Sequence, residues 1–173
     1  MKKLNPLFLL ALLCLLALPA LVFFGCSSSA PAKDPAPVNA GGASFGDIEG
    51  KEWILLELRR AGEIIAMDRQ QIEADGLSGA YTLVFEEGMV RGMAAPNRFS
   101  GPYTIGPYSP AGNELHIGLL ASTMMFSFIQ PEGLSENEFF ALLSAVSRWD
   151  LREGRLELYS SADGSEAVLV FIE

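Results

Sequence analysis

Cysteine is scarce in this sequence. Only Cys14 and Cys26 occur among its 173 residues, and both stand ahead of the region that we expect to fold. A framework of disulfide bonds, which small exported domains often use, is therefore excluded for that region. A bond between the two cysteines is excluded as well, because Cys14 lies in a segment that we expect to be removed.

Histidine and positive charge are also scarce. The chain has one histidine, His116, and its 12 basic residues are outnumbered by 21 acidic ones, for a net charge of −9. An acidic surface repels phosphate backbones, so no nucleic-acid partner is expected. Metal sites normally recruit several ligands, and neither a G-x-S-x-G nucleophile motif nor a calcium-loop motif is present. We therefore expect no metal, no cofactor and no enzymatic activity, with His116 pointing away from its apolar neighbours on a strand.

The N-terminus contains a long apolar run. Lys2 and Lys3 precede residues 7–24, which carry no charge and consist mostly of Leu, Ala, Phe and Val. A basic start followed by such a run is typical of a secretory signal peptide. An uncleaved transmembrane helix is the alternative, and Pro19 argues against it because proline interrupts helices.

The stretch "FGCS", residues 24–27, follows this run directly. It resembles the lipobox of bacterial lipoproteins, in which the Cys is acylated and becomes the mature N-terminus, although Phe23 stands where Leu is usual. The resemblance implies a lipoprotein signal peptide at residues 1–25, lipidation of Cys26 and contact with a membrane through the lipid. It implies a cell-envelope location. Ser27 after the Cys favours the outer membrane, facing the periplasm, over the inner membrane.

A linker separates the signal peptide from the domain. Residues 26–44 contain three prolines and two glycines and offer almost nothing to bury. This composition is typical of a flexible tether. We place the folded domain at residues 45–173, which is long enough to bury one hydrophobic core.

The pattern of the domain is rich in strands. Clusters of Gly, Pro, Ser or acidic residues separate short apolar stretches, which predicts antiparallel hairpins. The expected strands are residues 53–58, 81–85, 89–94, 99–105, 114–120, 149–152, 155–159 and 167–172. The last strand is apolar on both faces, so we expect both to be covered. We predict an α+β fold, with a strand-rich antiparallel sheet or partial barrel and one main helix at about 135–147.

The helix is predicted from its N-terminal cap and its periodicity. Ser135 and Glu138 fit the S-x-x-E capping box, in which each side chain bonds the other residue's backbone N–H. Apolar residues then recur at helical spacing and form one face. They are Phe139, Leu142, Leu143 and Val146.

Two further stretches, with this helix and the last strands, have the order of a known family. They are "VRGMAAPNRFSGPYTIG" at residues 90–106 and "LHIGLLASTMMFSF" at residues 115–128, and "IEGKEWILLEL" opens the domain. Together they resemble the META domain, the HslJ-like family of bacterial envelope proteins. The residues that carry the resemblance are Gly50, Trp53, Asn97, Arg98, Ser100, Gly101, Tyr103, Ser122, Thr123 and Glu138.

The chain departs from the family at three places. Many members have a cysteine where this chain has Pro96 and another near Ser127, and an arginine is frequent at the position of Met124. The resemblance implies a β-rich α+β domain without enzymatic activity, linked to envelope stress and antibiotic tolerance. We expect an accessory role exerted by binding an envelope protein or a small ligand. The alternative is a periplasmic inhibitor module that occludes an envelope hydrolase such as lysozyme.

Two segments have both a structural and a functional interpretation. Residues 97–101 have the Asn and Gly of a structural turn, which is the favoured interpretation, but Arg98 and Phe99 would also suit an anionic or peptide ligand. Residues 124–126, "MMF", and Phe128 are expected to pack in the core, because methionine fills irregular gaps between apolar side chains. The alternative is a surface that binds a soft metal or an apolar ligand.

Overall fold

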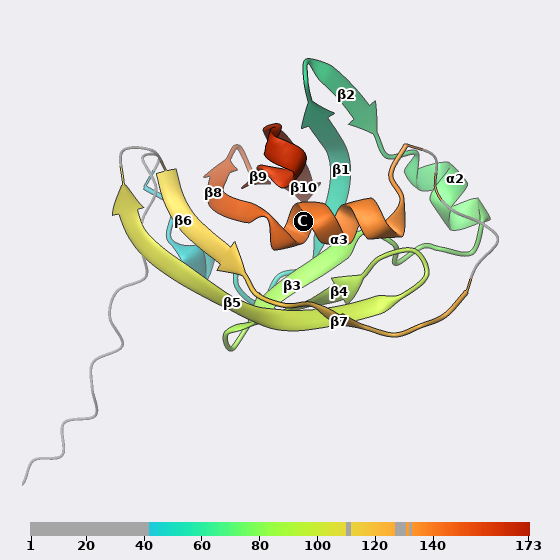
Figure 1. Cartoon of the computed structure of the whole chain (residues 1–173), viewed down its shortest axis with the longest axis horizontal. Helices are drawn as coiled ribbons and strands as arrows, with labels where there is room; N and C mark the ends of the chain where they lie inside the picture. The colour runs from blue at the N-terminus through green and yellow to red at the C-terminus, as the bar shows by residue number, and fades with distance from the viewer. Residues whose placement is uncertain (1–41, 110–111, 127–130, 132) are drawn as a thin grey trace, which may run out of the picture. The chain divides into compact units, whose positions relative to one another are not determined.

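The computed structural model describes residues 42–109, 112–126, 131 and 133–173 (Figure 1). All of them lie in the second of the two compact units into which the chain divides, residues 35–173. The predicted signal peptide, Cys26 and most of the predicted linker lie outside the described residues. Within those residues, no helix has both the length and the apolar character needed to cross a membrane.

The described part of the chain contains ten strands, all paired antiparallel in one sheet. They are β1 (Trp53–Arg60), β2 (Glu63–Ala66), β3 (Thr82–Glu86), β4 (Met89–Met93), β5 (Arg98–Ser109), β6 (Gly112–Ile117), β7 (Ala121–Ser122), β8 (Val146–Arg152), β9 (Arg155–Ser160) and β10 (Ala167–Ile172). The helical elements are η1 (Phe45–Asp47), α2 (Arg69–Ala74), α3 (Glu136–Ser144) and η2 (Ala162–Gly164).

The sheet closes into a barrel. Eight strands follow one another in the order β1-β3-β4-β5-β6-β8-β9-β10, and β10 then pairs with β1 from Ile54 opposite Ile172 to Arg60 opposite Ala167. The two remaining strands lie outside this ring: β2 forms a hairpin with β1, and β7 pairs with β5. A closed ring of strands leaves far less unpaired edge than an open sheet does.

The predicted α+β fold class is wrong. The described chain is mostly β, a closed eight-stranded barrel with two additional strands and one main helix. Closure depends on pairing between the first and last strands and on the bend of β5, whose register shifts between Ile105 and Tyr108. Residues 98–102 of β5 pair with β4 and residues 103–109 with β6, and the bulge bends the strand within this second part. Neither the pairing of β1 with β10 nor the bend of β5 can be recognised from residues that are close together in the sequence.

The predicted hairpins are present, because their turns are chemically distinct. Glu87-Gly88 joins β3 to β4 and Glu153-Gly154 joins β8 to β9, and all four residues have positive φ. Two consecutive positive φ angles match the twist of a hairpin, and glycine adopts them without strain. Ala61-Gly62 makes the same kind of turn between β1 and β2. That hairpin, α2 and β7 were not predicted.

Helix α3 covers the core of the barrel. In Figure 1 it lies between β10 and β3, and the side chains of Phe139, Leu142 and Leu143 are buried, as predicted. The helix is shorter than expected, because Val146 already begins β8. The core around it includes Phe45, Trp149 and inward-facing residues of the strands.

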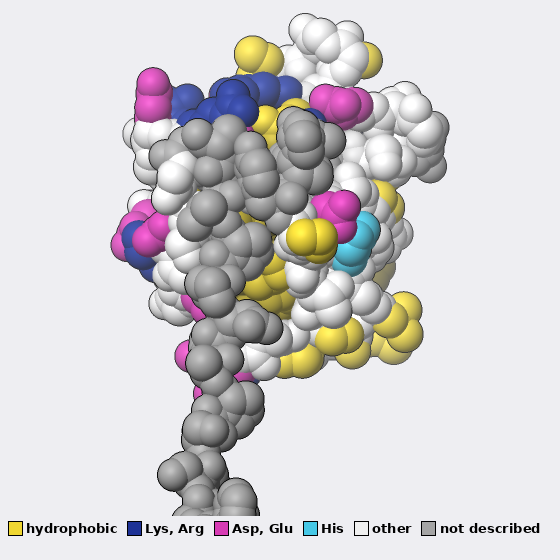
Figure 2. Space-filling view, turned by 90° about the vertical axis from the view of Figure 1, so that its left-hand side faces the viewer, with side chains coloured by type: hydrophobic (Ala, Val, Ile, Leu, Met, Phe, Trp, Pro, Cys, Tyr) yellow, Lys and Arg dark blue, Asp and Glu magenta, His cyan; other side chains and the backbone are white. Residues whose placement is uncertain are grey.

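The last strand is only partly covered on its outer face, contrary to the prediction, because Ile172 is 36 % exposed and Val168 is half-buried. Val170 of β10 lies opposite Glu57 on one neighbouring strand and Glu157 on the other, yet it is fully buried. Arg59 binds both carboxylates, at 2.5 Å from Glu57 and 3.1 Å from Glu157. Figure 2 shows acidic and basic side chains close together in this way on one face of the molecule. The long side chains therefore shield Val170 from water.

Candidate functional site

Asn97 is the centre of a hydrogen-bond network that joins three segments. Asn97 directly precedes β5, and it is only 4 % exposed. The side-chain oxygen accepts from the Thr123 hydroxyl at 2.8 Å and from the Met125 N–H at 2.6 Å. The side-chain nitrogen donates to the Met125 carbonyl at 3.0 Å and to Glu136 Oε2 at 2.9 Å. The amide thus uses both of its ends, and every partner comes from elsewhere in the chain.

The backbone around Asn97 adds to the same network. Glu136 Oε1 accepts from the Asn97 N–H at 3.0 Å, so the carboxylate bonds this residue twice. The Thr123 hydroxyl accepts from the Arg98 N–H at 3.2 Å, and the Thr123 N–H donates to the Arg98 carbonyl at 3.0 Å. Glu136 is also the first residue of α3, where the helix dipole stabilises a negative charge. Asn97 and Thr123 therefore act as structural residues. The expectation that residues 97–101 form a turn is wrong, because β5 begins at Arg98 and only Asn97 lies outside the strand.

Glu138 has a different partner from the one predicted. The Ser135 hydroxyl does accept from the Glu138 N–H, at 3.3 Å, as expected for the cap. The Glu138 carboxylate, however, forms an ion pair with Arg60 of β1. The buried Tyr81 hydroxyl donates to the Leu134 carbonyl just before this cap. Its pKa is raised to about 12, first by burial and then by the nearby Glu136 and Glu138 carboxylates.

Gly50 and Trp53 hold the chain at the start of the barrel. Gly50 has a φ of +74°, and its N–H donates to the Phe85 carbonyl at 2.8 Å. Trp53 is 1 % exposed, and its indole N–H donates to the Ile48 carbonyl at 3.0 Å. Only glycine adopts such a backbone conformation without strain. The structure thus places both family residues in structural roles, away from the Asn97 network.

Tyr103 and Gly101 of β5 also have structural roles. The buried Tyr103 hydroxyl donates to Glu49 Oε1 at 2.6 Å, and burial, followed by this bond, raises its pKa. A Cβ atom on Gly101 would lie 2.8 Å from the Leu119 carbonyl oxygen, so β5 and the segment after β6 pack too closely for a side chain. Ser100 is half-buried and Ser122 is exposed, and the Asn97 side chain bonds Thr123, Met125 and Glu136 instead of these serines.

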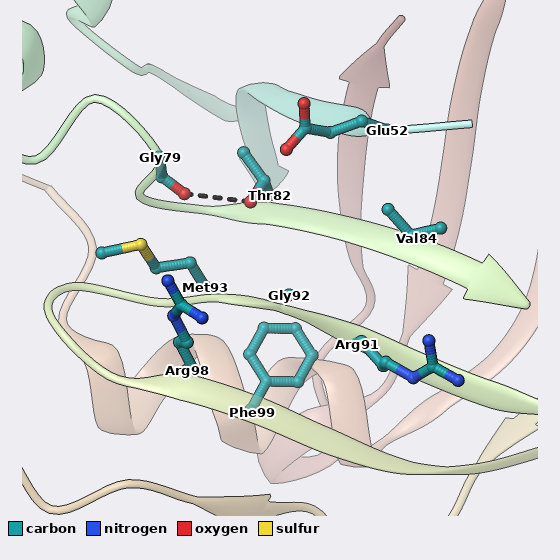
Figure 3. A pocket seen from close by; sticks show the side chains of 9 residues that line it. All are labelled: Glu52, Gly79, Thr82, Val84, Arg91, Gly92, Met93, Arg98 and Phe99. Atoms are coloured by element: carbon teal, nitrogen blue, oxygen red, sulfur yellow. Dashed lines mark hydrogen bonds between the residues drawn. The ribbon is translucent and has the colours of Figure 1, made fainter. Parts of the chain in front are cut away.

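Arg98 differs from these residues, because its side chain lies in a groove. The groove has a volume of about 420 Å³ and runs over β3, β4 and β5 (Figure 3). It is lined by Glu52, Gly79, Thr82, Val84, Arg91, Gly92, Met93, Arg98 and Phe99. Met93 lies opposite both Thr82 and Arg98 in the sheet, so these three side chains share one face. We call this the arginine groove.

The charges of the arginine groove are arranged on opposite sides. In Figure 3, Arg91 and Arg98 flank the ring of Phe99, while Glu52 lies across the groove from them. Arg91 pairs with Glu86 at 2.9 Å, and both side chains are 51 % exposed. Arg98 is exposed and forms no ion pair with any described residue. A guanidinium group of this kind can bind a carboxylate or a phosphate through two parallel hydrogen bonds.

Gly92 makes the floor of the arginine groove possible. A Cβ atom there would lie 2.0 Å from the Thr82 carbonyl oxygen and 2.7 Å from the Phe99 ring. No side chain fits at this place, so the aromatic ring packs directly against the strand backbone. The floor is therefore apolar, while the rim carries the arginines.

His116 and the acidic residues form no metal centre in the parts of the chain that the structure describes. His116 is exposed, and its neighbours Leu115 and Ile117 are buried, as predicted from the alternation of the strand. No group of three or more His, Cys, Asp or Glu residues within the described ranges is placed to hold a metal ion.

Several residues of the site were not predicted. Glu136 stands beside the predicted cap, Arg91 and Gly92 lie inside the motif stretch, and Glu52 precedes Trp53. The sequence contained no feature that joined them, because each meets its partners only through strand pairing or across the barrel. Asn97, Arg98 and Thr123 were indicated by the motif alone.

The sequence matches the model of the META domain family over residues 47–173. The chain belongs to the META domain family. The resemblance inferred from the motif stretches is thus confirmed, and the Asn97 network and the arginine groove both lie within this META domain. A search of curated proteins gave no match.

Two solved structures are similar to this META domain. One is an NMR structure of a protein from Burkholderia xenovorans, with a TM-score of 0.54 and 22 % identity, covering 84 % of this chain and 94 % of the other. The second is a crystal structure of a DUF4847 family protein from Bacteroides vulgatus, with a TM-score of 0.48 and 12 % identity, covering 74 % and 95 %. The first likeness supports the fold of the META domain.

Proposed function

We propose that this protein is a lipid-anchored, non-enzymatic component of the cell envelope whose arginine groove binds an anionic group of a ligand. The observation that carries the proposal is the contrast between Arg98 and the other polar residues of the motif. Asn97, Thr123 and Tyr103 bond other parts of the domain, so they are committed to structure. The Arg98 side chain is exposed at the groove, beside Arg91.

The chemistry of the arginine groove favours a ligand with a carboxylate or phosphate and a small apolar part. The two guanidinium groups supply the charge-assisted hydrogen bonds, and Val84 and Met93 supply an apolar surface. The backbone of Arg98 is held by Thr123, so its side chain starts from a fixed position. A fixed starting position lowers the entropy cost of binding.

Replacing Arg98 with alanine should weaken this binding about tenfold, which corresponds to about 1.4 kcal/mol. The probes are inorganic phosphate and an acetylated glutamate dipeptide, each titrated into the protein while backbone amide signals are followed by NMR. With wild type we expect shifts at Gly92, Met93 and Arg98 for at least one probe. The backbone bonds to Thr123 remain in the variant, so the fold should be retained.

Arg155 provides the matched control, because it is also an exposed arginine of the barrel but lies at the start of β9. Arg155→Ala should leave both titrations unchanged. If Arg98→Ala and Arg155→Ala weaken the binding of a probe equally, the probe responds to the overall charge of the protein and not to the arginine groove. If neither probe shifts the groove signals of wild type, the arginine groove is not an anion site.

The anchor is tested at Cys26. Cys26→Ala should abolish incorporation of radiolabelled palmitate and leave a larger, unprocessed precursor, because the acylated thiol is the proposed attachment point. Cys14→Ala is the control, since this thiol lies within the apolar run of the predicted signal peptide. It should be labelled and processed like wild type. Normal processing of Cys26→Ala would contradict the lipoprotein proposal.

Inhibition of a basic envelope hydrolase, such as lysozyme, is a second proposal. The net charge of −9 favours it, because an acidic surface attracts a basic protein. The Arg98→Ala variant separates the two proposals. An inhibitor that works through its acidic surface should reduce lysozyme activity equally with or without Arg98. Roles in envelope stress and antibiotic tolerance are proposed from the family resemblance.

A further inference from the structure

Residues 119–126, here called the apolar segment, expose four large apolar side chains. Leu119 is 91 % exposed, Met124 99 %, Met125 62 % and Phe126 81 %. The expectation that residues 124–126 pack in the core is therefore wrong, and Phe128 lies outside the described residues. In Figure 2 apolar side chains are exposed along the lower edge, the edge at which Figure 1 shows β5 and β7. Single exposed apolar residues are ordinary, whereas a contiguous group usually marks a contact surface.

The backbone of the apolar segment is held from inside. Asn97 bonds both the N–H and the carbonyl of Met125, and the backbone of Thr123 bonds that of Arg98. The Asn97 amide therefore fixes the backbone at Met125, while the side chains of Met124 and Met125 are exposed.

The composition of the apolar segment fits lipid better than a protein partner. Residues 117–131 contain no charged residue, in a chain with 33 charged residues. Charged groups and unpaired backbone groups are costly in hydrocarbon. Here the Met125 backbone is already paired on both sides by Asn97. The Leu, Met and Phe side chains can then enter a lipid surface without leaving the Met125 backbone groups unpaired.

The stretch between Cys26 and the domain is short enough to keep the apolar segment near a lipid bilayer. Seventeen residues, 27–43, separate Cys26 from Ser44, which caps η1. Seventeen residues reach at most about 60 Å when fully extended. A domain attached at Cys26 is therefore never far from the bilayer that holds the lipid.

We propose that the apolar segment inserts its Leu, Met and Phe side chains into the surface of the bilayer, so that the META domain lies against the membrane. This inference rests on the proposed lipid anchor at Cys26. It adds a second contact, made by the folded domain itself. Two weak membrane contacts on one chain reinforce each other, because the first raises the effective concentration of the second.

The test uses the full-length gene product, extracted from bacterial membranes and reconstituted into phosphatidylcholine vesicles with brominated acyl chains. Phe126→Trp introduces a reporter at the apolar segment. The native Trp53 and Trp149 are 1 % and 0 % exposed, so they provide a constant background. We expect the added fluorescence of the Phe126→Trp protein to be blue-shifted and strongly quenched by the brominated lipid.

Ile64→Trp is the matched control, because Ile64 is 63 % exposed but lies on β2, outside the apolar segment. Its added fluorescence should not be quenched. Flotation with the vesicles reports the anchor separately. A protein that floats while Phe126→Trp is quenched no more than Ile64→Trp would overturn the inference and leave the anchor intact. A protein that does not float would contradict the anchor, and with it the inference.

Self-association has a distinct signature. If the Phe126→Trp emission shifts to the blue in the absence of vesicles and does so with rising protein concentration, a second copy of the chain covers the apolar segment. That result would also overturn the proposal. Circular dichroism of each variant confirms that the barrel is retained, which is expected because both replaced side chains are exposed.

Discussion

Replacing Asn97 with aspartate should lower the free energy of unfolding by about 3–4 kcal/mol at neutral pH, since breaking a buried polar network is among the costliest substitutions. The side-chain nitrogen that donates to Glu136 and to the Met125 carbonyl would become an oxygen. Two carboxylates would then face each other, and the Met125 carbonyl would lose its donor. Urea unfolding followed by circular dichroism measures the loss.

The pH dependence identifies the cause of this loss. The new carboxyl lies beside Glu136, so its pKa in the folded state should be higher than in the unfolded chain. A raised folded-state pKa means that the folded state favours the protonated form, which can donate a hydrogen bond. The stability deficit should therefore shrink as the pH falls below about 5 and grow as it rises again.

Asn137 provides a control with the same chemical change. It is exposed and lies next to Glu136 in the first turn of α3. Asn137→Asp should be neutral or slightly stabilising, because a negative charge is favourable at a helix N-terminus. If Asn97→Asp and Asn137→Asp unfold at the same urea concentration, Asn97 does not hold the three segments together.

Phe139→Ala should cost about 3–5 kcal/mol, the usual range for removing a fully buried phenylalanine. Phe139 is 0 % exposed, and its ring packs edge-on against Tyr81, with 5.1 Å between ring centroids, and against Phe99 at 6.0 Å. The substitution would leave a cavity between α3 and the barrel wall. Thermal and urea unfolding measure the loss.

The neighbouring Phe140 is the control for size and position. It is half-buried, and its ring contacts Phe99 at 5.6 Å. Phe140→Ala should cost less than half as much as Phe139→Ala, because part of its surface already faces water. Equal losses would mean that α3 is held by its outer rather than its inner face, contrary to the burial observed here.

Asn97→Asp and Phe139→Ala both test how helix α3 holds the proposed binding surfaces in place. Helix α3 supplies Glu136 to Asn97, and Asn97 in turn fixes the backbone of Met125. Arg98, the next residue, points its side chain at the arginine groove. The same stretch of chain therefore positions the proposed anion site on one side and the apolar segment on the other. A variant that loosens α3 should weaken both proposed contacts.

Local features of the sequence were sufficient to predict the hairpins and the main helix. Glu87-Gly88 and Glu153-Gly154 specify tight turns, and Ser135 caps α3. Each works through neighbours within a few residues, so its effect can be read without the rest of the chain. The hairpin at Ala61-Gly62 was not predicted, although its turn has the same two positive φ angles as the others.

The META motif indicated Asn97, Arg98 and Thr123 but not what they contact. The partners Glu136 and Met125 lie 39 and 28 residues further along the chain from Asn97. Such distances are bridged only when the barrel closes, and closure depends on which strand pairs with which. A pattern along the sequence specifies the faces of a strand but not the neighbour on either side.

By itself, the sequence determined the family, the turns, the capped helix and the acidic net charge. Only the tertiary structure decided that the sheet closes, that Glu138 pairs with Arg60, and that "MMF" at residues 124–126 faces outward. Composition predicted burial for that segment, because apolar side chains gain most by leaving water. In the fold, the Asn97 amide bonds both backbone groups of Met125, and pairing backbone polar groups is a requirement that composition does not reveal.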